Sequence, residues 1–283
     1  MQRKTLRIRL STGLSLEGVR YPGGARTPTV CLPGLTRNAR DFDDIAPIIA
    51  ATGRDAIALS LRGRGGSDRA ENHLTYHPAT YRDDIIEAMD ILGLPRAVFL
   101  GTSLGGITTM LIAAAAANRV TGAIINDVGP ELAAEGIARI VGYAGHTRAE
   151  ATSLEDAADQ IRAINEVAFP GRDADFWRAF ARRTYAEKED GRWVLDYDQR
   201  IGKALTEAPP APDLWPAFAS LKDAPTLVVR GALSDLLSPA IVAKMRAVHP
   251  CFEYCEVAGV GHAPLLDEPE AVAAISAFLN RID

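Results

Sequence analysis

Ser103 is the residue of this sequence best suited to act as a nucleophile. It is the central residue of the pentapeptide G-T-S-L-G at 101–105, which follows the apolar run 97–100 and precedes a helix-forming stretch at 107–117. A serine on such a sharp strand-to-helix turn exposes its hydroxyl, and small residues two positions before and after it let the strand and helix pass without collision. The pattern therefore predicts a nucleophilic serine. The alternative is that Ser103 only caps the helix.

His262 is the best candidate, among five histidines, for the base that must take the proton of a serine hydroxyl. It alone follows a predicted strand, 252–257, and it lies in a glycine-rich turn at 258–264. Such a loop can present an imidazole at the carboxyl edge of a parallel sheet. We therefore expect His262 to act first as general base and then as general acid, the alternative being an exposed loop histidine.

Two aspartates could orient His262. Asp235 follows the predicted strand 226–230 and gives the chain order Ser, Asp, His, whereas Asp127 ends the predicted strand 122–126 at the same sheet edge. The chain order favours Asp235 and leaves Asp127 as the alternative acid. Either residue could instead cap a turn, because aspartate readily accepts hydrogen bonds from backbone amides.

Acyl transfer also needs hydrogen-bond donors for the oxyanion, and backbone amides commonly supply them. The amide of Leu104 is one candidate, because it begins the helix after Ser103. The amide of Leu35 is the other, because Leu35 lies in the turn that follows the predicted strand 28–32. The sequence thus predicts an oxyanion hole made of Leu35 and Leu104.

A mostly parallel sheet covered by helices would bring these residues to one edge, and the sequence predicts such an α/β fold. Short aliphatic or β-branched runs alternate with helical segments near both ends of the chain, and the first two runs should pair as a hairpin. The predicted strands are 4–10, 17–20, 28–32, 56–61, 97–100, 122–126, 226–230 and 252–257, and the predicted helices are 43–52, 78–92, 104–117, 239–248 and 269–280.

The alternation stops in the middle of the chain. Residues 129–219 are helical and charged, with interspersed aromatic residues and a proline-rich break. We interpret them as a helical cap inserted into an α/β core made of 1–128 and 220–283. The residues predicted to bind substrate are Arg37 of the core and Trp177, Arg183 and Tyr185 of the cap. The alternative is that the aromatic residues only pack the cap onto the sheet.

Composition argues against several classes of protein. A net charge of -5 without a dense basic run argues against a nucleic-acid partner. The most apolar helix, 107–117, is shorter than the roughly 18 residues that cross a bilayer, and the N-terminus lacks the apolar core of a signal peptide. Cys251 and Cys255 would lie about 13 Å apart in a strand, too far for one tetrahedral metal ion. We expect a cytoplasmic protein with a small-molecule substrate, no metal and no membrane partner.

Taken in order, these motifs resemble those of a capped α/β-hydrolase. They are the turn 33–35, the glycine-rich loop 61–67, the sequence 101–106, Asp235, Gly261 and His262. The resemblance covers almost the whole chain and implies an eight-stranded sheet with an antiparallel second strand, no cofactor and an acyl-enzyme mechanism. Pro33 stands where many relatives have histidine, but it precedes the expected amide donor. Some members have their acid after the earlier strand, which keeps Asp127 open.

The expected reaction is hydrolysis of a carboxylic ester, thioester or lactone by Ser103. The same residues could cleave an amide or a carbon–carbon bond, and a slow-turnover ligand receptor is the alternative from another class. Arginines at 37, 40, 62, 64, 182 and 183 suggest a substrate with a second acidic group. The alternative is that these arginines pair with nearby acids such as Asp41, Asp68 and Glu187.

Overall fold

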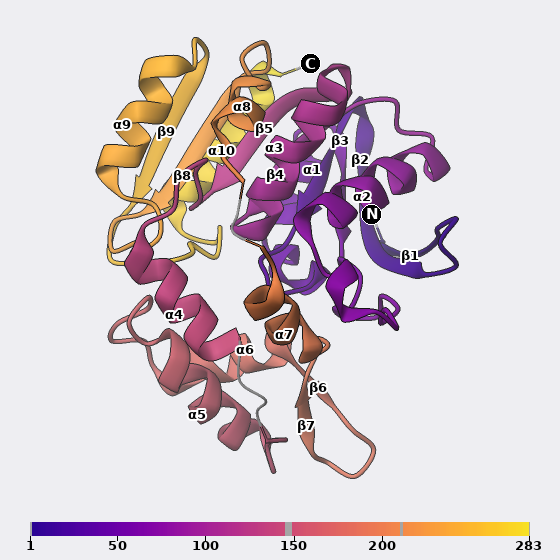
Figure 1. The fold of residues 1–283 in the computed structure, drawn as a ribbon, viewed down its shortest axis with the longest axis vertical. Coiled ribbons are helices and arrows are strands. Elements are labelled where there is room, and N and C mark those ends of the chain that lie inside the picture. Colours follow the sequence, from indigo (N-terminus) through magenta and orange to yellow (C-terminus); the bar gives the residue numbers. More distant parts are fainter. Residues whose placement is uncertain (1, 145–148, 210–211, 283) are drawn as a thin grey trace.

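One sheet carries the predicted site residues. The computed structural model describes residues 2–144, 149–209 and 212–282, and within these ranges the sheet has seven strands (Figure 1). They are β1 (Lys4–Arg9), β2 (Ser15–Leu32), β3 (Arg54–Leu59), β4 (Ala97–Thr102), β5 (Val120–Asn126), β8 (Thr226–Gly231) and β9 (Phe252–Val257). Neighbouring strands follow the order β1, β2, β4, β5, β8, β9, with β3 also paired to β2. The pairs from β2 to β9 are parallel, so the carboxyl ends of these strands meet at one edge.

The strand β2 explains why seven strands are found where eight were expected. The predicted strands 17–20 and 28–32 are the two ends of this one long strand. Residues 18–21 align with β3 in the antiparallel sense, whereas residues 29–31 align with 56–58 in rising order. The strand bends sharply between these halves at Gly23, where a Cβ would lie 2.1 Å from the carbonyl oxygen of Arg54. Only glycine fits such a close approach between two strands. The arrangement of the sheet as a whole confirms the predicted α/β class with a mostly parallel sheet.

Helices cover both faces of the sheet, as predicted. They are α1 (Ile45–Ala51), α2 (Pro78–Ile91), α3 (Leu104–Ala116), α8 (Trp215–Ala219), α9 (Pro239–Val248) and α10 (Pro269–Arg281). Helix α3 contacts α2 and α8 on one face, and α1 contacts α10 on the other. Five of the six were predicted with boundaries correct to within two residues, and the short α8 was not. None of the helices in the described part of the chain is both long enough and apolar enough to span a membrane.

The segment between β5 and α8 forms a separate group of elements beside the sheet. It contains α4 (Ala134–Ala144), α5 (Leu154–Asn165), α6 (Ala174–Thr184), β6 (Tyr185–Glu187), β7 (Trp193–Leu195) and α7 (Arg200–Glu207). We call residues 134–144 and 149–207 the cap segment. Side-chain caps begin two of its helices, because Ser153 accepts from the amide of Asp156 and Asp173 accepts from that of Phe176. In Figure 1 the cap segment lies below the sheet, and the hairpin β6–β7 within it was not predicted.

Candidate active site

Ser103 lies on the tight turn between β4 and α3, with φ 52° and ψ −114°. Gly101 and Gly105, two positions before and after Ser103, are required because a larger side chain would collide with the neighbouring backbone. A Cβ on Gly101 would lie 2.4 Å from the carbonyl of Gly105, and a Cβ on Gly105 would lie 2.0 Å from the carbonyl oxygen of Leu32. The Ser103 side chain makes no capping hydrogen bond to α3, so the alternative reading as a helix cap does not hold.

His262 is hydrogen-bonded to the Ser103 hydroxyl, with 2.9 Å between Nε2 and Oγ. Its ring is largely buried, with 9% of the residue exposed. The loop that carries it contacts the cap segment, because the amide of Gly261 donates to the carbonyl of Ala168 across 2.6 Å. The base predicted from the sequence thus lies at the predicted nucleophile.

Asp127 completes the chain of hydrogen bonds. Its Oδ2 lies 2.8 Å from Nδ1 of His262, and the residue is fully buried. The carboxylate also accepts hydrogen bonds from the amide of Gly231 (2.9 Å) and from the hydroxyl of Ser234 (2.7 Å). Because the ionised carboxylate can only accept, Nδ1 of His262 must carry a proton, and in the neutral ring Nε2 is then free to accept the proton of Ser103.

The prediction that Asp235 would orient His262 is wrong. The carboxylate of Asp235 instead binds Arg139 of α4 through two hydrogen bonds of 2.5 and 2.9 Å. Burial alone would raise the pKa of Asp235, but the hydrogen bonds and charge of Arg139 outweigh burial and lower it. The loop after β8 does contact the site, because the hydroxyl of Ser234 in this loop donates a hydrogen bond to Asp127.

Both predicted oxyanion residues lie near Ser103. Leu104 is the first residue of α3, so its amide has no acceptor within the helix. Leu35 follows Gly34, and a Cβ on Gly34 would lie only 3.8 Å from Cβ of Ser103. The turn 33–35 therefore passes beside the serine, and the oxyanion role of the two amides stays a prediction.

The sequence predicted Arg64 only as one of several arginines that could favour an acidic substrate, and its contact with the turn 33–35 was not predicted. Arg64 is fully buried, and its Nε donates to the carbonyl of Leu35 across 2.9 Å. Its guanidinium also donates to Arg62 O (2.7 Å) and Tyr81 Oη (2.8 Å) and stacks on the Tyr81 ring at 4.7 Å. Among the described residues, Arg64 has no carboxylate within ion-pair distance and its buried NH2 nitrogen has no hydrogen-bond partner. The signal available in the sequence was its place in the glycine-rich loop 61–67.

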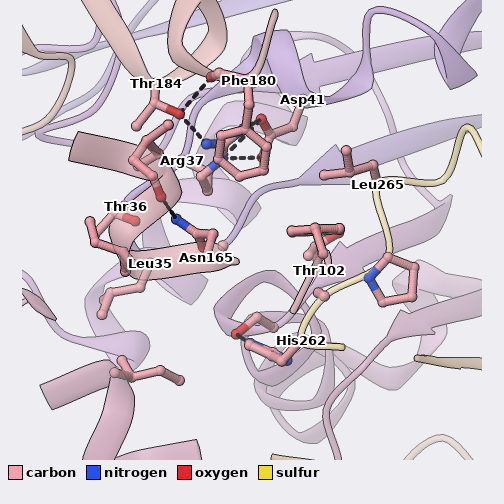
Figure 2. A pocket seen from close by; sticks show the side chains of 18 of the residues that line it. Leu35, Thr36, Arg37, Asp41, Thr102, Asn165, Phe180, Thr184, His262 and Leu265 are labelled. Atoms are coloured by element: carbon pink, nitrogen blue, oxygen red, sulfur yellow. Dashed lines mark hydrogen bonds and ion pairs between the residues drawn. The ribbon is translucent and has the colours of Figure 1, made fainter. Parts of the chain in front are cut away.

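A pocket opens beside Ser103 and His262, with walls from the core and from the cap segment (Figure 2). Its apolar wall includes Phe42, Ile140, Ile161, Ile164, Phe169, Phe180, Leu195 and Leu265, and its polar wall includes Thr36, Arg37, Asp41, Asn165, Thr184 and Tyr197. Arg37 thus lies where it was predicted to lie. A ligand in this pocket would therefore contact hydrocarbon side chains together with several hydrogen-bonding groups.

Three residues predicted to bind substrate do not line this pocket. Trp177 is buried among Phe169, Phe176 and Phe180, and Arg183 pairs with Asp44 at 2.5 Å. Tyr185 is also buried, and its hydroxyl donates to the side chain of Gln160 across 3.2 Å. Phe180 and Thr184, four residues apart on one face of α6, do line the pocket. Trp177 shares that face but lies nearly two turns before Thr184, where its ring packs against the neighbouring aromatic rings.

The arginines of the sequence hypothesis are largely neutralised. Arg37 pairs with Asp41, Arg40 with Asp196, and Arg62 with Asp84. No group of histidine, cysteine and acidic side chains in the described part of the chain could hold a metal ion.

The chain is similar in sequence and in structure to known alpha/beta hydrolases. A family model described as "Alpha/beta hydrolase family" matches residues 29–275. The chain is 32% identical to the 3-hydroxybutyrate-oligomer hydrolase of Cupriavidus necator, covering 89% of this chain and 87% of that protein. It is 28% identical to the 2-(acetamidomethylene)succinate hydrolase of Mesorhizobium japonicum, covering 88% and 86%. The crystal structure of an alpha/beta hydrolase from Novosphingobium aromaticivorans superposes with a TM-score of 0.91 at 40% identity, covering 99% and 98% of the two chains.

Proposed function

The chain belongs to the alpha/beta hydrolase family and is a hydrolase, and from that membership we propose that it cleaves carboxylic esters through an acyl-enzyme formed on Ser103. The observation that carries the proposal is the hydrogen-bonded series Ser103, His262, Asp127 at the pocket. These three groups are the nucleophile, the base and the orienting acid that acyl transfer requires.

In the proposed first step, Oγ of Ser103 attacks the ester carbonyl while Nε2 of His262 takes its proton. Asp127 stabilises the resulting imidazolium without taking a proton itself. The negative charge on the carbonyl oxygen is stabilised by the amides of Leu35 and Leu104. Nε2 then gives its proton to the departing alkoxide, which leaves as an alcohol.

In the second step, water attacks the acyl-enzyme. His262 takes a proton from the water and returns one to Oγ of Ser103, so that the carboxylic acid is released and the serine is restored. The balance is one ester and one water consumed, with one acid and one alcohol formed.

The proposed substrate class is a short ester of a hydroxy acid. The 3-hydroxybutyrate-oligomer hydrolase of Cupriavidus necator supports this class, because hydroxy acids in an oligomer are joined by ester bonds. The pocket suits such a chain, since its hydrocarbon wall would contact the alkyl groups and its polar wall would bind the oxygens. The 2-(acetamidomethylene)succinate hydrolase supports amide cleavage as the second candidate, because an acetamido group contains an amide bond.

A fluorophosphonate probe followed by a substrate panel tests the proposal. We expect the probe to label Ser103 and the Ser103→Ala variant to remain unlabelled. The panel contains the dimer of 3-hydroxybutyrate, simple esters, a thioester, a lactone, an N-acetyl enamine and a diketone. Highest kcat/KM on the dimer or on simple esters supports ester hydrolysis. Highest kcat/KM on the enamine would transfer the function to amide cleavage, and labelling without turnover of any compound would favour a receptor.

A further inference from the structure

The polar wall of the pocket contains a largely buried ion pair between Arg37 and Asp41. Arg37 and Asp41 both line the pocket, and their side chains are only 12% and 15% exposed. Nε of Arg37 lies 3.0 and 2.9 Å from the two carboxylate oxygens of Asp41. A terminal nitrogen of Arg37 also donates to Asp41, and the other donates to the hydroxyl of Thr184.

The position of Arg37 is fixed on several sides. Its guanidinium carbon lies 4.2 Å from the centre of the Phe180 ring, so the flat face of the guanidinium is covered. Gly34 is close to both Arg37 and Ser103, because a Cβ on Gly34 would lie 3.6 Å from Cγ of Arg37 and 3.8 Å from Cβ of Ser103. Figure 2 shows the pair with Thr184 and Phe180 on one side of the pocket and His262 on the other.

Arg37 still has donors to offer. An arginine has five N–H groups, and three of them are used by Asp41 and Thr184. No acceptor among the described residues is recorded for the other two, one on each terminal nitrogen. The charge of this donor is already compensated, because the Asp41 carboxylate lies against it. A substrate carboxylate would lose its hydration here and meet a pair with no net charge.

We infer that this wall is a subsite for a neutral hydrogen-bonding group of the substrate, such as a hydroxyl or an ester carbonyl, and that Asp41 excludes carboxylates by neutralising Arg37. The inference rests on the proposed ester hydrolysis and specifies its acyl group. It replaces the sequence-based expectation that arginines would favour a second acidic group.

The test compares kcat/KM for dimethyl glutarate and for its hemi-ester, monomethyl glutarate, at low ionic strength. Wild type should prefer the neutral diester. Asp41→Asn keeps the shape of the side chain and leaves the charge of Arg37 uncompensated, so the ratio of hemi-ester to diester should rise by about tenfold or more. Arg37→Gln leaves an unpaired carboxylate, so the same ratio should fall below that of wild type.

Asp44→Asn is the matched control. Asp44 also pairs with an arginine, Arg183, but neither residue lines the pocket, so the ratio should not change. An unchanged ratio in a folded, active Asp41→Asn variant overturns the inference, as does a wild-type preference for the hemi-ester. If Asp41→Asn does not fold, the direction of the change in Arg37→Gln decides the question.

Failure of the proposed function gives a different result. If wild type hydrolyses neither glutarate ester and no ester of the panel above, ester cleavage is refuted, and the subsite is tested by calorimetry on Ser103→Ala. Tighter binding of dimethyl glutarate than of glutarate, reversed by adding Asp41→Asn, supports the inference. Tighter binding of glutarate before that change overturns it.

Discussion

Ser103 and Asp127 occupy matching positions at the ends of adjacent parallel strands, each with a positive φ, 52° and 56°. The preceding residues, Thr102 and Asn126, are paired in the β4–β5 ladder, and the amide of Ser103 donates to the carbonyl of Asn126 across 2.9 Å. Positive φ is uncommon for residues other than glycine and persists where the surroundings enforce it. The backbone therefore fixes the separation of these two side chains, and His262 fits between them.

The first prediction concerns the proposed nucleophile and base. Ser103→Ala and His262→Ala should each lower kcat by about a thousandfold or more, because each removes a member of one mechanism. Circular dichroism and thermal unfolding should stay close to wild type. Cys251→Ser, at an exposed position, is the control and should retain full activity. Residual activity above a tenth of wild type in either alanine variant contradicts the mechanism.

The second prediction separates the two acids. Asp127→Asn should lower kcat by about 10⁴-fold, because an amide nitrogen facing Nδ1 would favour the wrong tautomer of His262. Asp235→Asn should change kcat by less than about tenfold, because Asp235 pairs with Arg139 and not with His262. Steady-state kinetics on one ester gives the ranking, and a larger loss in Asp235→Asn would return the role to that residue.

The third prediction concerns Arg64 as a positioning residue. Arg64→Met leaves the carbonyl of Leu35 without its buried donor, which should destabilise the fold by about 1–3 kcal/mol. It should also lower kcat more than it raises KM, because the expected oxyanion donor is no longer held in place.

Tyr81→Phe is the matched control for Arg64. It removes the hydrogen bond between Tyr81 and Arg64 but leaves the bond to Leu35 intact, so it should lower stability without lowering kcat. Denaturant unfolding and steady-state kinetics measure the two effects. Equal losses of kcat in the two variants would show that Arg64 acts on stability alone.

The fourth prediction is a pH dependence of stability at His249. Burial lowers the pKa of this histidine, against a smaller opposing effect of its hydrogen bond to Leu221. Nδ1 also accepts from the amide of Cys251 (3.2 Å), which requires an unprotonated Nδ1. The unfolded chain therefore binds a proton more readily, so stability should be lost as the pH falls from about 6.5 through the lower pKa of the folded state.

His249→Phe tests this dependence. The ring lies 5.5 Å from Phe218 and 6.4 Å from Phe252, so phenylalanine keeps the aromatic contacts and removes the titration. Histidine titrates between about pH 7 and 5. Over this range the free energy of unfolding of the His249→Phe variant should vary less with pH than that of wild type. Parallel curves for the two proteins would contradict the assignment.

The sequence was informative where local pattern determines structure. The pentapeptide around Ser103 has its spacing because Gly101 contacts Gly105, and such close contacts leave a recognisable signature. The sheet and its helices followed from runs of apolar residues for the same reason. The bend in β2 was harder to predict, because Pro22, Gly23 and Gly24 have the composition of a turn while the strand continues through them.

The acid could not be assigned from the sequence. Asp127 and Asp235 both follow strands that end at the same edge, so position alone does not distinguish them. The deciding contact is the ion pair of Asp235 with Arg139, which lies 96 residues away along the chain. The same limit applies to Arg64, whose role depends on a carbonyl 29 residues earlier.

The hydrogen bond from Gly261 to Ala168 joins the loop that carries His262 to the cap segment, which forms part of the pocket wall. His262, the proposed base, is the next residue along the chain, so a movement of Ala168 away from the sheet would break the contact beside it. Opening of the pocket by that route would remove a hydrogen bond from the loop that carries His262. If His262 moved with its loop, its hydrogen bond to Ser103 would be lost while the pocket was open, and substrate entry and reaction would then be successive events.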